Sequence, residues 1–154
     1  MIRKLFIFAC MMFFSFSAFA LPDSPNPQDW DNRAKSDLED ARLVLQNTSH
    51  YDQVCFLSHQ AVEKSLKGAL IGRGVQPDKS HDTAQLAARL NKLGYHLKQF
   101  HNQLQELDRL YVPSRYPKVG NSFSQEKAVQ NLELAETIYK QVSQTEHKLP
   151  VNKS

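Results

Sequence analysis

Four polar residues stand at helical spacing in the segment FLSHQAVEKSLKGALI, which covers residues 56–71. Gln60, Glu63, Lys64 and Lys67 share one side of a helix, because residues three and four apart are neighbours on a helix surface. Two ammonium groups on that side could meet a phosphate. The alternative is a solvated face, on which the acid-first pair of Glu63 and Lys67 adds about 0.2–0.5 kcal/mol. Spacing alone favours the solvated face.

A second polar group follows in the tripeptide Ser80-His81-Asp82. An imidazole can exchange a proton near neutral pH or bind an anion when it is charged. Ser80 and Asp82 are also residues that cap helices, so one of them can begin the next helix and leave His81 in a loop. Both interpretations stay open.

The third group is the cluster from Tyr111 to Tyr116, which contains Arg115. Arginine offers a rigid fork of donors for phosphate, and aromatic rings offer surfaces on which a base can stack. Pro113 and Pro117 predict a loop here, because proline interrupts a helix. The alternative role of Arg115 is therefore to tie this loop to helix ends.

Other site types find little support. His96 and His101 are five residues apart without a repeated acidic or cysteine partner, whereas a structural zinc needs four ligands at defined spacing. Gly72-Arg73-Gly74 lacks the further glycines and the lysine of a phosphate loop. Cys55 lies on an apolar helical face, which favours a buried small hydrophobe. We expect neither a metal nor a cofactor.

The first 20 residues resemble a secretory signal. Arg3 and Lys4 precede an uncharged, mostly apolar run of 16 residues from Leu5 to Ala20, and Ala18 and Ala20 suit signal peptidase. We expect cleavage after Ala20, a secreted or periplasmic protein, and no membrane association afterwards. An uncleaved anchor is the alternative, although a membrane span needs about 20 residues.

Removing that segment changes the charge. The chain has 154 residues with 19 Lys+Arg against 16 Asp+Glu, and the remaining 134 residues keep 17 basic against 16 acidic. A nearly neutral domain binds nucleic acid only through a local basic patch. Of the two cysteines only Cys55 remains, so an intramolecular disulfide is excluded. The length suits one compact domain.

The elements that must position these residues are helices. Apolar residues recur at helical spacing, and no segment shows sustained period-two alternation. The expected fold is an all-α, antiparallel up-and-down bundle of about five helices. We expect a linker at 21–28, the bundle at 29–146 and a disordered tail at 147–154. The expected helices begin near Asn26-Pro27, capped by Asn26, and then run over about 51–71, 83–93, 97–111 and from Ser122 or Ser124 onward.

Small residues form a line on the second helix, next to its core face. They are Ser58, Ala61, Ser65 and Gly68. Such a line lets another backbone approach closely, either within the bundle or across a dimer.

Three blocks together resemble the HEPN (higher eukaryote and prokaryote nucleotide-binding) domain family, from about Trp30 to Val142. The first is Trp30 with Ala34, Asp37-Leu38 and Ala41. The second is Cys55-Phe56 with residues 60–64 (QAVEK) and Leu66-Lys67. The third is Ser80-His81-Asp82 together with Tyr111 and Arg115-Tyr116-Pro117.

The resemblance implies a helical bundle, often dimeric, with a link to nucleotides or RNA. Many members are metal-independent ribonucleases, often toxins, with an arginine followed after four to six residues by a histidine. Arg115 has no histidine in that range. Arg89 and His96 match formally, but they straddle Gly94 at a helix end.

Three hypotheses result. The first is a non-catalytic nucleotide- or RNA-binding bundle, in which lysines, His81 and Arg115 meet phosphate while Tyr111 or Tyr116 contacts a base. The second is a ribonuclease with His81 or His96 as base and Arg115 or Arg89 as phosphate stabiliser. The third is a homodimeric interaction module, which an exported setting favours. For the first, no catalytic residue is assigned, and the expected ligand-binding residues are Gln60, Glu63, Lys64, Lys67, His81, Tyr111, Arg115 and Tyr116.

Overall fold

The computed structural model describes residues 23–116 and 123–149. Within these ranges the chain is helical and contains no strand. The predicted all-α bundle of five helices is confirmed. The elements are α1 (Pro27–Asn47), α2 (Tyr51–Gly72), α3 (Thr83–Asn91), a 3-10 turn η1 (Lys98–Phe100), α4 (His101–Arg115) and α5 (Gln125–Lys148).

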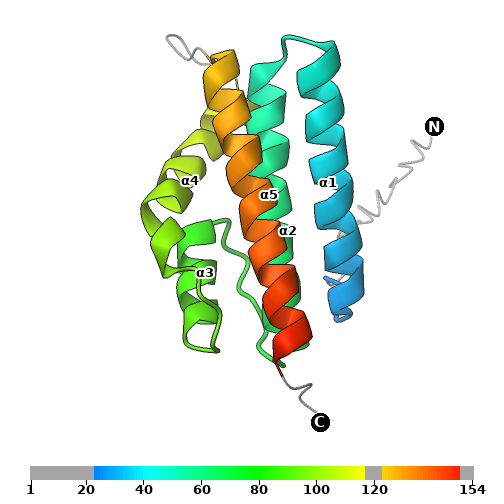
Figure 1. Ribbon diagram of the computed structural model, residues 1–154, viewed down its shortest axis with the longest axis vertical. Helices are drawn as coiled ribbons and strands as arrows, with labels where there is room; N and C mark the ends of the chain where they lie inside the picture. The colour runs from blue at the N-terminus through cyan, green and yellow to red at the C-terminus, as the bar shows by residue number, and fades with distance from the viewer. Residues whose placement is uncertain (1–22, 117–122, 150–154) are drawn as a thin grey trace, which may run out of the picture.

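The long helix α2 is the centre of the bundle. Figure 1 shows α1, α2 and α5 running side by side, with the shorter α3 and α4 on the side away from α1. Helix α2 contacts each of the other four α-helices. A polar face of α2 that turns toward α3 and α4 therefore lies inside the molecule.

Apolar side chains of α2 fill the core as its spacing predicts. Cys55, Val62, Leu66 and Leu70 are buried. Leucines of α3 and α4 and the apolar face of α5 pack against them. The Cys55 sulfur accepts a hydrogen bond from Asn131 Nδ2 at 3.2 Å, and burial raises the pKa of this thiol. Cys55 is thus a core residue, as predicted.

The small-residue line packs within the chain. A Cβ atom on Gly68 would lie 2.9 Å from Trp30 Cβ and 3.3 Å from the Pro27 carbonyl oxygen, so α1 occupies the space that glycine leaves. Ser58 and Ala61 are fully buried as well. This line therefore offers no free surface to a second copy, and a homodimer stays a prediction that needs another surface.

Helix α4 extends into the expected loop. The prediction that Pro113 ends the helix is wrong, because α4 runs to Arg115. Proline removes one donor, but the Tyr116 amide still donates to the Val112 carbonyl at 3.2 Å, and the Ser114 hydroxyl donates to the Tyr111 carbonyl at 2.9 Å. The last turn therefore closes, and Arg115 stands one turn beyond Tyr111 on the same face.

Three helices begin at side chains that cap them. The side chains of Asn26, Asp82 and Ser124 accept hydrogen bonds from the amides of α1, α3 and α5. Helix α1 begins at Pro27, two residues before the expected start of the bundle at residue 29. Helix α5 includes His147 and Lys148, so these two residues are not part of a tail, contrary to the prediction for 147–154. The expected signal (1–20) and residues 150–154 lie outside the described residues.

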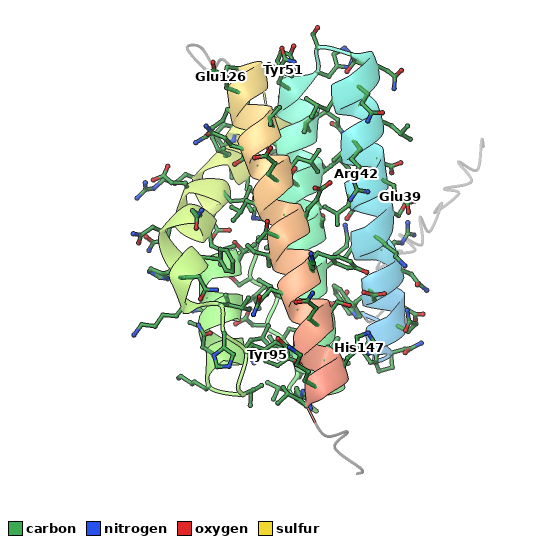
Figure 2. The ribbon with its side chains drawn as sticks, in the orientation of Figure 1. Glu39, Arg42, Tyr51, Tyr95, Glu126 and His147 are labelled. Carbon is green, nitrogen blue, oxygen red and sulfur yellow. The ribbon has the colours of Figure 1, made fainter. Side chains whose placement is uncertain are left out.

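The lower end of the bundle is tied by a buried phenol. Figure 2 shows Tyr95 at the same end as His147, opposite Tyr51. Tyr95 donates to Glu146 and accepts from Arg73 Nε at 3.2 Å. Burial and the neighbouring Glu146 carboxylate raise the pKa of Tyr95 to about 12, so the phenol stays neutral. None of the described helices is both long enough and apolar enough to span a membrane.

Candidate functional site

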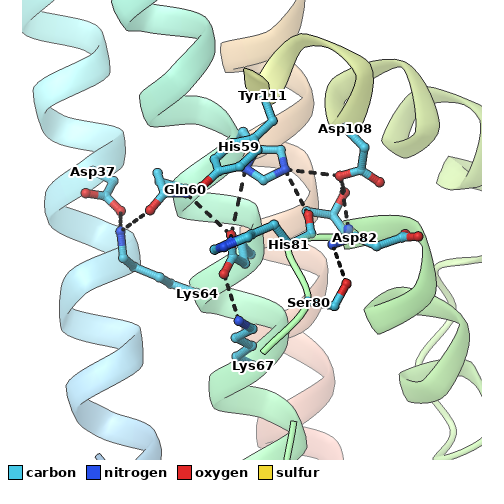
Figure 3. A network of polar contacts seen from close by, with 12 residues as sticks. Asp37, His59, Gln60, Lys64, Lys67, Ser80, His81, Asp82, Asp108 and Tyr111 are labelled. Carbon is cyan, nitrogen blue, oxygen red and sulfur yellow. Dashed lines mark hydrogen bonds and ion pairs between the residues drawn. The ribbon is translucent and has the colours of Figure 1, made fainter. Parts of the chain in front are cut away.

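A network of polar side chains lies between α2, the α2–α3 connection and α4 (Figure 3). Glu63 is its centre. One carboxylate oxygen accepts from Lys67 Nζ at 2.8 Å and the other from His81 Nδ1 at 2.9 Å. The side chains of Glu63 and Lys67 are only 7% and 6% exposed. Our interpretation of this pair as part of a solvated face is therefore wrong, because α2 turns this face toward α3 and α4.

The ionised state of Glu63 depends on these partners. Burial alone would raise its pKa, since a carboxylate loses hydration in the interior. The hydrogen bonds and positive charges of Lys67 and His81 outweigh burial and hold the pKa below its ordinary value. Glu63 is thus a buried anion that fixes the position of His81.

His59 is a member of this network that our sequence analysis missed. Its ring is 1% exposed, and Nε2 lies 3.1 Å from both the His81 carbonyl oxygen and Asp108 Oδ1. Its other nitrogen, Nδ1, is 3.9 Å from Glu63 Oε2 and has no hydrogen-bond partner within the described residues. The sequence does place His59 on the same helix face as Glu63, because His59 precedes it by four residues.

Asp108 is the second residue that the sequence analysis missed. It accepts from the Thr83 amide and hydroxyl at 3.0 and 2.8 Å, from the Ala84 amide at 3.2 Å, and from His59. Burial would raise its pKa, but these donors keep it below the ordinary value. Asp108 thereby joins α4 to the first turn of α3 and to His59. The sequence could have indicated Asp108, because it precedes Arg115 by seven residues and therefore lies on the same helix face.

The outer part of the site is aromatic and cationic. The Tyr111 ring stacks on His59 and on His81, with centroids 4.5 and 4.9 Å apart. Arg115 Nη1 donates to the Tyr111 hydroxyl at 2.8 Å. The guanidinium carbon lies 5.5 to 5.7 Å from the centroids of Tyr111, Phe56 and Tyr116. We call these five residues, Phe56, His81, Tyr111, Arg115 and Tyr116, the aromatic–arginine face.

This face is open and its arginine is not neutralised. His81 keeps 53% of its side chain exposed, and Tyr116 is 56% exposed. Arg115 is exposed, and in the described ranges no carboxylate lies within ion-pair distance of it. The face can therefore offer charged donors and ring surfaces together.

Two expected site residues turn away from this face. Lys64 Nζ pairs with Asp37 of α1 at 2.5 Å and also donates to Gln60 at 3.2 Å. Gln60 in turn donates to Glu63 at 3.4 Å. The structure thus connects Lys64 and Gln60 to the network, but Lys64 joins α1 to α2. Lys67 is enclosed with Glu63, so both lysines are already paired.

The formal arginine–histidine match lies in another environment. Arg89 donates to the Gln76 carbonyl at 2.9 Å and lies 3.5 Å from Asp78, so it ties α3 to the preceding connection. His96 is exposed, beyond the positive-φ residue Gly94. Neither residue takes part in the Glu63 network.

The surface grooves include few residues of the network. A groove of about 500 Å³ between α1, α2 and α5 is lined by Asp31, Tyr139 and Glu146 among others, and includes none of the network residues. A groove of about 350 Å³ between α3 and α4 reaches Asp82 and Asp108. The described residues contain no group of three or more side chains placed to hold a metal ion.

Comparison with known proteins agrees with this architecture. The HEPN domain family model matches residues 27–145. The crystal structure of TT1696 from Thermus thermophilus is 28% identical with a TM-score of 0.70, and that of ST0689, an archaeal HEPN homologue, is 28% identical with a TM-score of 0.63. Each alignment covers 79% of this chain and 98% of the other. No curated protein is significantly similar.

Proposed function

The chain belongs to the HEPN domain family, and we propose that it is a non-catalytic module that binds nucleotides or single-stranded RNA at the aromatic–arginine face. Arg115 and His81 would contact phosphate, and Tyr111 or Tyr116 would stack on a base. Glu63, Lys67 and Gln60 would hold this face in place from behind, and Lys64 would fasten α2 to α1.

One observation carries this proposal: Arg115 lies among three aromatic rings and has no acidic partner in the described ranges. Arginine presents a planar fork of donors that suits phosphate, and its charge is not consumed by a carboxylate. Stacking of a base on an aromatic ring contributes about 1–3 kcal/mol. The combination suits a ligand with both a phosphate and a base.

Binding of a short single-stranded RNA and of AMP tests the proposal. The change Arg115→Ala should weaken binding about 10- to 100-fold, because a hydrogen bond to a charged group contributes about 1.5–3 kcal/mol. Arg109→Ala is the matched control, since it removes the same charge from an exposed position of α4 that pairs with Glu106. Equal affinities for the wild type and the Arg115 variant would refute the proposal.

We also propose that the module acts after export, because residues 1–20 have the composition of a secretory signal. The mass of the purified protein from an exporting host tests this directly. A chain that begins at Leu21 and is found outside the cytoplasm is the expected result. A full-length chain retained in the cytoplasm would contradict it.

A second candidate function is RNA cleavage, and the His81–Glu63 pair favours it. Glu63 binds His81 Nδ1, and about half of the His81 side chain is exposed. A histidine oriented by a carboxylate can serve as general base, and Arg115 would stabilise the phosphate. Cleavage by the pure protein, lost in His81→Ala, is the expected result. A broad panel of RNAs left intact would exclude this activity.

A further inference from the structure

We propose that His59 is a buried proton acceptor, and that its protonation is coupled to anion binding at the aromatic–arginine face. This inference rests on the proposed binding function and concerns its regulation. It starts from one atom: His59 Nδ1 is the buried side-chain nitrogen for which the described residues supply no hydrogen-bond partner.

The hydrogen bonds of the ring decide where its proton lies. His59 Nε2 faces the His81 carbonyl oxygen and Asp108 Oδ1, each at 3.1 Å. A carbonyl oxygen and an ionised carboxylate only accept, so Nε2 must carry a hydrogen. In the neutral ring Nδ1 is therefore a bare acceptor without a donor. A second proton on the ring can bind only at Nδ1.

The groups that face the ring favour this second proton. From α2, the Glu63 carboxylate lies 3.9 Å from Nδ1, with the Lys67 ammonium on its other oxygen. From the α2–α3 connection, His81 presents its ring and its carbonyl oxygen. From α4, Asp108 faces Nε2 and the Tyr111 ring stacks at 4.5 Å. A charged His59 ring would thus lie between two carboxylates and against one aromatic face.

The shared carboxylate links the buried ring to the exposed one. Glu63 Oε2 binds His81 Nδ1 at 2.9 Å and is the atom nearest to His59 Nδ1. A shift of about 1 Å would give it a normal hydrogen bond to a protonated His59. Glu63 Oε2 would then accept hydrogen bonds from both histidines. His81, about half of whose side chain is exposed, connects Glu63 to the surface.

Charge explains the coupling to ligand. With both histidines neutral, Lys67 and Arg115 balance Glu63 and Asp108, and the local net charge is zero. Each proton taken up by His59 or His81 adds one positive charge beside the aromatic–arginine face. A phosphate is attracted more strongly as this charge rises, and by linkage its binding promotes proton uptake by the same free energy.

The test follows the imidazole ¹⁵N signals of His59 in labelled protein between about pH 5 and pH 8.5. The probe is a short oligouridylate without a terminal phosphate, because its phosphodiesters keep their charge while a phosphomonoester titrates near pH 6. The change His81→Gln removes the exposed imidazole of the pair and leaves the His59 ring in place. The change His59→Gln identifies the His59 signals.

We expect His59 Nδ1 to change from a bare to a protonated nitrogen as the pH falls, with a midpoint that moves to higher pH when the oligouridylate is bound. In His81→Gln, the affinity for the oligouridylate should rise by up to tenfold for each unit by which the pH falls, which is the slope for one linked proton. If His59 keeps one protonation state while the oligouridylate binds, the inference is overturned and the binding function stands. If the oligouridylate and AMP do not bind at any pH, the binding function itself is overturned.

Discussion

Replacing Lys67 tests whether the centre of the site is enclosed. Its ammonium lies 2.8 Å from Glu63 Oε1, and both side chains are less than a tenth exposed. The informative set is Lys67→Met, Glu63→Gln and the double variant. Methionine keeps most of the length of lysine, and glutamine keeps the shape of glutamate, so the variants remove charge with little change in volume.

The expected magnitude follows from distance and burial. At 2.8 Å two unit charges attract by about 6 kcal/mol at an effective dielectric constant of 20, against about 1.5 kcal/mol in water. Desolvation offsets much of this attraction. Lys67→Met leaves Glu63 buried with His81 Nδ1 as its remaining hydrogen-bond donor from the α2–α3 connection, so we expect it to lower the free energy of unfolding by about 3 kcal/mol. The double variant should be more stable than the sum of the two losses predicts, with a coupling energy of about 1–3 kcal/mol.

The assay is urea unfolding at pH 7 and low ionic strength, because urea does not screen charges. The matched control is the exposed pair of Glu106 and Arg109, three residues apart on α4. Its coupling energy should stay below about 0.5 kcal/mol. If the coupling energy of Glu63 and Lys67 were no larger than that of the control, the enclosed arrangement would be refuted and the pair would be a solvated one.

Three further predictions concern the packing of α1 against α2 and the carboxylates of the site. Gly68→Ala should destabilise the protein by about 1–2 kcal/mol in thermal unfolding, because the new Cβ would lie 2.9 Å from Trp30 Cβ. Gly72→Ala should change the stability little, because its Cβ would make ordinary contacts of 3.7 Å or more. Equal losses of stability in the two variants would contradict the close approach of α1 at Gly68. Asp108→Ala should lower the free energy of unfolding by about 2–4 kcal/mol in urea, because the first turn of α3 loses its acceptor, and an unchanged midpoint would argue against this tie. Folding lowers the pKa values of Glu63 and Asp108. The stability that these carboxylates contribute should therefore be fully present above about pH 5 and be lost as the pH falls through the lowered values. Urea midpoints that stay constant from pH 5 to pH 3 would disprove this.

The helices could be predicted because their signals are local. Asn26 and Asp82 cap helices where their types suggest, and the apolar stripe of α2 is buried as its spacing indicates. The predicted loop at Pro113 is wrong for a local reason too. Proline interrupts a helix interior, but in the last turn its missing donor leaves enough hydrogen bonds for the helix to reach Arg115.

The site could be predicted only in part. Glu63, His81, Tyr111 and Arg115 were chosen by type and spacing, and the structure brings them together. His59 was missed, although it is one helical turn from Glu63. A histidine in an apolar helix has no mark of its own, and its role depends on a carbonyl group and a carboxylate that come from other elements.

The sequence by itself determined the helical class, most helix limits, the core face of α2 and the residue types available for phosphate and base. These properties depend on neighbours within a turn or two along the chain. The tertiary structure decided which polar groups are buried, because burial depends on which helices cover which face. By placing α3 and α4 over α2, it turned Glu63 and Lys67 from an apparent surface pair into an enclosed one. The same packing left Arg115 exposed among aromatic rings.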